Sequence, residues 1–148
     1  MKKLFGVFIL FFLSMGAYAQ ILTPVKWSYA AKKVSEQEAV IYIKATIEPG
    51  WHIYSQTVGE GGPIKTSFNF AASDQFSLVG STVEPKPENK FDKTFNMDVP
   101  YFEKSVVFQQ KIKLNAVSAD VKGVLEFMVC NDHQCLPPEE VEFSIPVS

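Results

Sequence analysis

Short stretches in which apolar and polar side chains alternate constrain the fold most strongly. Successive side chains of a β-strand point to opposite faces of its sheet, so each stretch predicts a strand with one buried face. The stretches span residues 41–47, 68–70, 106–114, 125–129 and 141–147. Turn-forming residues separate them, at 48–50, 59–63, 80–81, 84–87 and 115–120. No convincing amphipathic helix appears, and about seven short strands predict an all-β, immunoglobulin-like antiparallel β-sandwich.

The first 19 residues are typical of a secretory signal peptide. Lys2 and Lys3 give a positive start, residues 4–13 are apolar, and Ala17-Tyr18-Ala19 is a small-residue cleavage site. Ten apolar residues are about half of what a bilayer span needs, so we expect cleavage rather than anchoring. Residues 20–148 are then one domain, which we expect to be soluble in an oxidising compartment where disulfides persist.

Charge and motifs exclude several classes of function. The chain has 16 acidic residues, 14 lysines and no arginine, the residue best suited to binding phosphate. We therefore expect no nucleic-acid partner. A serine-nucleophile motif, a glycine-rich phosphate loop and a convincing pair of catalytic carboxylates are also absent, and no cofactor is expected.

The two cysteines of the chain lie close together, with four residues between Cys130 and Cys135. A disulfide between them would close a loop of about six residues and stabilise the fold by only roughly 2 kcal/mol. Such a bond can be opened and closed at little cost to the fold. The strand phase points Val129 toward the core and Cys130 to the opposite side, where we expect Cys130 to be open to partners.

Residues 128–139, Met-Val-Cys-Asn-Asp-His-Gln-Cys-Leu-Pro-Pro-Glu, resemble the cysteine element of the N-terminal periplasmic domain of the thiol:disulfide interchange protein DsbD. Residues 50–54 look like the strand beside the family's active cysteines, and residues 88–92 resemble its cap loop. Two local departures are a shorter intercysteine loop and His52 in the place of a family tyrosine. The chain also ends at Ser148 without the membrane-embedded and thioredoxin-like segments of full-length members.

This resemblance implies a periplasmic thiol:disulfide oxidoreductase that relays reducing equivalents. Cys135 would attack a client disulfide, and Cys130 would resolve the mixed disulfide. The expected donor is a membrane-embedded thiol reductase or a thioredoxin-like protein, and the expected clients are periplasmic proteins with disulfides. No metal is required.

The resemblance also implies roles for residues around the cysteines. His52 and Tyr54 would shape the floor of the active site, unless they only pack within their strand. Phe91 would cover the disulfide until a partner displaces it. Within the intercysteine loop, protonated His133 could hold a thiolate and Asp132 would oppose one, unless His133 is simply a solvated loop residue.

Two other classes of function remain open from the sequence. One is a non-catalytic binding or assembly module in which the cysteines only staple a hairpin. The other is copper(I) capture by a soft ligand set of Cys130, Cys135, His133 and Met128.

Overall fold

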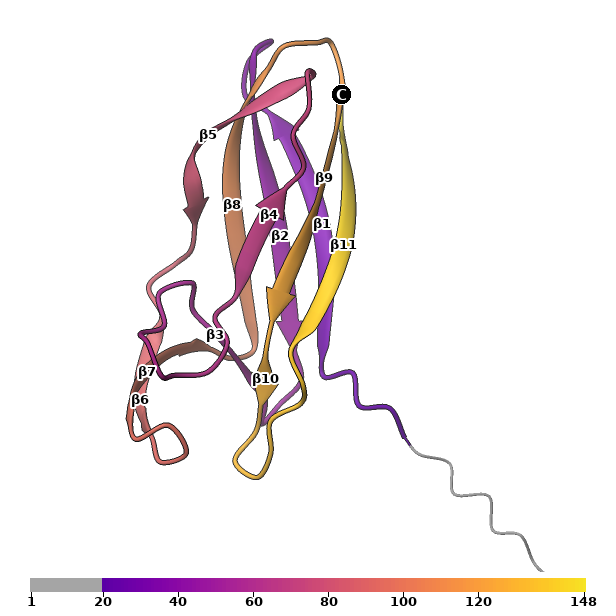
Figure 1. Ribbon diagram of the computed structural model, residues 1–148. Coiled ribbons are helices and arrows are strands. Elements are labelled where there is room, and N and C mark those ends of the chain that lie inside the picture. The colour runs from indigo at the N-terminus through magenta and orange to yellow at the C-terminus, as the bar shows by residue number, and fades with distance from the viewer. Residues whose placement is uncertain (1–19) are drawn as a thin grey trace, which may run out of the picture.

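The computed structural model describes residues 20–148, which form eleven strands and no helix (Figure 1). The proposed signal peptide, residues 1–19, lies outside the described residues. In the described part of the chain no helix is long and apolar enough to span a membrane. The strands are β1 (Val25–Lys33), β2 (Glu38–Ile47), β3 (His52–Tyr54), β4 (Ser67–Phe70), β5 (Phe76–Val83), β6 (Glu88–Asp92), β7 (Met97–Phe102), β8 (Ser105–Leu114), β9 (Ala119–Phe127), β10 (Val129–Cys130) and β11 (Glu139–Val147).

Two antiparallel sheets form the body of the molecule. One has the strand order β1-β2-β8-β5 and the other β11-β9-β4, and Figure 1 shows them as two layers. Alternate side chains of the strands fill the space between the sheets, among them the fully buried Ile43, Phe108, Leu125 and Ile145. The alternation in the sequence and the core therefore agree, and the predicted immunoglobulin-like sandwich is confirmed.

A third sheet extends one end of this sandwich. Its order is β10-β3-β7-β6, and it lies at the lower end in Figure 1, opposite the C-terminus. β10 continues the direction of β9 after one intervening residue, and β3 follows β2 after a turn at residues 48–51. The cysteine-bearing strand is thus anchored in the sandwich and projects beyond it.

The turn predicted at Gly80 and Ser81 is wrong, because both residues lie inside β5. The pairing of β5 with β8 shifts between Val79 and Val83, and Gly80 has a φ of 70°, a conformation that favours glycine. Gln110 of β8 supports this bulge: its amide nitrogen donates to the Gly80 carbonyl oxygen at 3.2 Å. β1, β5, β6 and β7 were not among the predicted strands.

Candidate active site

The two cysteines form a disulfide at the tip of a hairpin. Cys130 ends β10, and its Cα lies 4.0 Å from that of Cys135. The residues on either side are already hydrogen-bonded across the hairpin, since the amide of Leu136 donates to the carbonyl oxygen of Val129 at 2.9 Å. The backbone therefore holds the cysteines opposite each other independently of the covalent bond.

Asn131 shapes the loop between the cysteines. Its side-chain oxygen accepts hydrogen bonds from the amides of His133 and Gln134, each at 2.8 Å. Its own amide donates to the carbonyl oxygen of Gln134, also at 2.8 Å. The sequence analysis missed this residue, although an asparagine at the start of a tight loop is a known signal for such a turn.

The two sulfur-bearing residues differ sharply in exposure. Cys130 is only 2% exposed and packs with the buried side chains of Tyr54 and Val99, whereas Cys135 is exposed. The expectation that Cys130 is open to partners is wrong. The strand phase was correct, because Val129 joins the main core and Cys130 does not. The opposite face is not open, however, because Cys130 packs there with Tyr54 of β3 and Val99 of β7, and β7 was not predicted.

His52 lies directly across from Cys130 in the β3–β10 pair. Directly opposed residues of an antiparallel pair project to the same face with Cβ atoms about 5 Å apart, so the side chains of His52 and Cys130 start side by side on that face. His52 is 5% exposed, and its Nε2 atom lies 3.0 Å from the hydroxyl oxygen of Tyr54. Burial, together with the positive charge of Lys90, lowers the pKa of His52 to about 4 despite opposing effects of Asp92 and Asp132.

Two tyrosines complete the wall around His52. The Tyr54 and Tyr101 rings meet the imidazole edge to face, with centroids 5.3 and 5.6 Å away. Burial raises the pKa of Tyr54, and the hydrogen bond to Glu88, followed by burial, raises that of Tyr101. Lys90 lies over the Tyr101 ring, 4.7 Å from its centroid. Both hydroxyls are therefore neutral near neutral pH and can donate hydrogen bonds.

The chain leaving β3 is fixed by Glu84, another residue that the sequence analysis missed. Its Oε1 atom accepts hydrogen bonds from the Ser55 hydroxyl at 2.8 Å and from the Gln56 amide at 3.0 Å. The Ser55 amide also donates to the carbonyl oxygen of Pro100 in β7. These bonds hold the strand that carries His52 and Tyr54. Nothing in the local sequence around Glu84 signals this long-range role.

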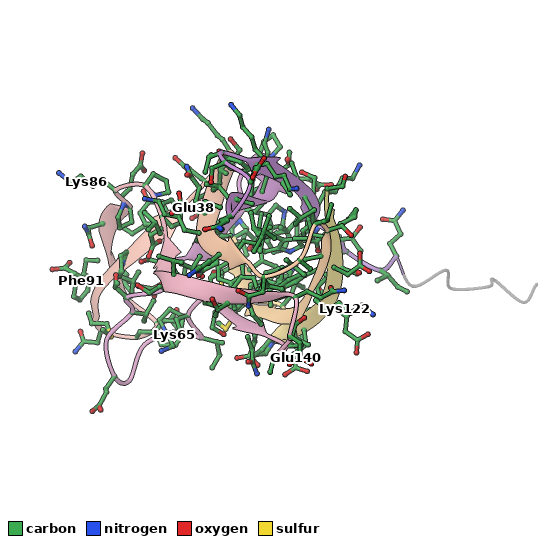
Figure 2. All side chains as sticks on the ribbon, turned by 90° about the horizontal axis from the view of Figure 1, so that it is seen from above. Glu38, Lys65, Lys86, Phe91, Lys122 and Glu140 are labelled. Carbon is green, nitrogen blue, oxygen red and sulfur yellow. A yellow bond between two sulfur atoms is a disulfide. The ribbon has the colours of Figure 1, made fainter. Side chains whose placement is uncertain are left out.

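Three predicted site residues lie apart from the buried group. Phe91 is 57% exposed, and it pairs with Asp98, whereas the neighbouring pair Lys90–Val99 faces Cys130. Phe91 is therefore on the outer face of the β6–β7 hairpin, and Figure 2 shows it at the edge of the molecule, away from the yellow disulfide.

Asp132 and His133 are both exposed in the intercysteine loop. The charge of Asp132 acts on His52, while His133 contributes its backbone amide to the Asn131 turn. Within residues 20–148 no group of three or more His, Cys, Asp or Glu side chains could hold a metal ion. The alternative of copper(I) capture by Cys130, Cys135, His133 and Met128 therefore finds no support among the described residues.

These features define a class of protein: an immunoglobulin-like sandwich with a half-exposed disulfide in the hairpin between β10 and β11. Residues 19–146 match the family described as "Thiol:disulfide interchange protein DsbD, N-terminal", and the chain belongs to that family. No curated protein matches its sequence.

Solved structures of low sequence identity share the fold. The N-terminal domain of Neisseria meningitidis DsbD in the reduced form is 20% identical, with a TM-score of 0.54, over 79% of this chain and 82% of that one. The N-terminal periplasmic domain of ScsB from Proteus mirabilis is 22% identical, with a TM-score of 0.60, over 86% of this chain but only 49% of that one. A complex between the DsbD and PilB N-terminal domains of N. meningitidis gives 19% identity and a TM-score of 0.55, over 84% of this chain and 86% of that chain.

Proposed function

We propose that the domain is a periplasmic thiol:disulfide oxidoreductase that relays reducing equivalents from a reductase to disulfide-containing clients. The observation that carries this proposal is the unequal exposure of the two cysteines, 2% for Cys130 against an exposed Cys135. A structural staple has no need of an accessible sulfur, whereas exchange requires one.

The exposure of Cys135 and the burial of Cys130 assign a different chemical step to each cysteine. A donor thiolate attacks the Sγ atom of Cys135, forms a mixed disulfide there, and the bonding electron pair of the old disulfide passes to Cys130. A second donor thiol then attacks the donor sulfur of that mixed disulfide and releases reduced Cys135. In the forward step, the Cys135 thiolate attacks a client disulfide and expels one client thiolate. Cys130 then attacks Cys135, which restores the internal disulfide and frees the second client thiol.

Two relatives support the location and the partners. The ScsB domain is described as periplasmic, and the DsbD domain of N. meningitidis forms a complex with another protein domain. We infer that this chain acts in the periplasm, with a membrane-embedded reductase or a thioredoxin-like protein as its donor.

Single-cysteine variants test the proposal. Cys130→Ser keeps the exposed nucleophile and removes the resolving thiol, so it should accumulate mixed disulfides with client proteins. Cys135→Ser keeps only a buried thiol and should trap far fewer. Non-reducing electrophoresis of periplasmic extracts, with the double serine variant as the blank, measures both. Equal trapping by the two variants would contradict the assignment.

The reduction potential of the Cys130–Cys135 pair distinguishes a redox-active disulfide from a structural one. Structural disulfides in secreted proteins typically lie below about −300 mV, and a relay needs a more oxidising couple. We expect the Cys130–Cys135 pair to fall above that value when it is equilibrated with dithiothreitol buffers. A potential well below it would favour the non-catalytic module.

A further inference from the structure

The buried sulfur raises a question of charge. Attack at exposed Cys135 leaves the electron pair, and hence a negative charge, on Cys130, which is 2% exposed. A thiolate removed from water is costly unless a positive charge or a hydrogen-bond donor compensates it. The side chains around Cys130 must supply that compensation.

Charged groups approach this point from several elements. Asp92 on β6 and Asp132 in the intercysteine loop are negative and would oppose a thiolate, and Lys90 on β6 lies over the Tyr101 ring. His52 is the titratable side chain directly across the strand pair from Cys130. It is also neutral near pH 7 while the disulfide is closed, because burial and Lys90 lower its pKa to about 4.

The hydroxyl of Tyr54 can accommodate two protonation states of His52. A tyrosine hydroxyl both donates and accepts, so at 3.0 Å it can donate to an unprotonated Nε2 or accept from a protonated one. The hydrogen bond between Nε2 and the Tyr54 hydroxyl can therefore persist in either protonation state of the imidazole.

We propose that His52 takes up a proton when the Cys130–Cys135 disulfide opens, and so balances the negative charge left on the buried Cys130 sulfur. The inference rests on the disulfide opening that the proposed function requires. In the balanced step, the donor thiolate bonds to Cys135, the Cys130–Cys135 bond breaks, its electron pair stays on Cys130, and one proton from water goes to the imidazole. His52 is thus a charge-balancing residue, and its position in the sheet makes proton uptake part of reduction.

Histidine NMR titrations test the inference directly, and the chain offers its own reference. It has two histidines, and exposed His133 lies on the loop rather than in the buried group. In the oxidised domain we expect His52 to titrate near about 4. After reduction with dithiothreitol its pKa should rise by about 3 pH units, to about 7 or above, which is the upper end of the usual effect of an adjacent opposite charge, with a smaller change at His133.

Cysteine variants identify the charge responsible. Cys135→Ser retains the Cys130 thiol and should keep the raised pKa of His52, whereas Cys130→Ser should not. Coupling between two titrating groups is reciprocal. In the Cys135→Ser background, His52→Gln should therefore raise the midpoint of the Cys130 thiolate absorbance by the same number of pH units.

An identical His52 titration in the oxidised and reduced domains would overturn the inference, and so would a raised pKa that persists in Cys130→Ser. The thiolate titration needs only a folded Cys135→Ser domain. The inference can therefore be tested even if the Cys130→Ser variant does not fold. Neither measurement uses a client. If client trapping is lost while the pKa shift of His52 remains, only the proposed function is contradicted. If trapping remains while the pKa of His52 does not shift, only this inference is contradicted.

Discussion

Reduction of the disulfide should leave the sandwich folded. The perturbation is simple, because dithiothreitol opens the Cys130–Cys135 bond without changing any residue. The main core lies between the two large sheets, and neither cysteine belongs to it. The hydrogen bonds from Leu136 to Val129 and from Asn131 to Gln134 also close the hairpin without the sulfurs.

The size of the effect follows from the loop. The cysteines are five positions apart, so the bond closes about six residues, and the chain-entropy relation gives about 2 kcal/mol at 25 °C. For a domain of this size, 1 kcal/mol corresponds to a change in Tm of roughly 4 °C. We therefore expect reduction to lower the Tm by about 8 °C.

Thermal unfolding followed by circular dichroism, with and without reductant, measures this difference. The double variant Cys130→Ala with Cys135→Ala provides a control in which reductant should have no effect. Loss of the folded baseline at 25 °C on reduction would refute the reasoning, because it would mean that the bond holds the sheets together. A Tm difference above about 20 °C would refute it equally, since loop closure cannot supply that much.

Three further results are expected. Asn131→Ala removes an acceptor for two amides, so urea unfolding should show a loss of about 1 kcal/mol in both redox states; because the hairpin stays closed without the sulfurs, the reduction potential should shift by less than about 20 mV in a dithiothreitol equilibration. Phe91→Ala should change the rate of disulfide reduction by a small thiol less than twofold, because Phe91 faces outward; a severalfold increase would show that the hairpin moves to cover the disulfide. The pKa of His52 is depressed in the folded state, so its contribution to stability is present above pH 6.5 and is lost as the pH falls toward 4. Urea unfolding of the oxidised domain should therefore show a loss of about 2 to 3 kcal/mol between pH 7 and 4.5, and His52→Gln should largely remove it.

The sandwich could be predicted because each of its long strands has one buried face. In β2, and in β11 from Phe143 onward, every second residue is buried, and the sequence shows that period directly. The pattern is harder to interpret where a polar residue occupies a core position. Gln110 is 2% exposed on the core side of β8, but it is there to bind the bulge at Gly80, and a single strand contains no sign of that partner.

The site was predictable only in its covalent part. The cysteine spacing and the turn propensity of Asn131 are local and can be read from the chain. The burial of Cys130 and the position of His52 beside it depend on the register of β3 against β10, two segments separated by more than 70 residues. The outward direction of Phe91 likewise depends on a hairpin whose strands carry too little apolar alternation to be recognised.

A single exposed cysteine also limits the order of events. If electrons both enter and leave through Cys135, a donor and a client compete for one atom and cannot be bound covalently at the same time. The domain must then release its donor before it meets a client, which is a ping-pong scheme. Steady-state rates measured against both partners should give parallel double-reciprocal lines, and an excess of oxidised donor should slow turnover by occupying the reduced domain. In such a relay the flux depends on how quickly each partner leaves as much as on how tightly it binds.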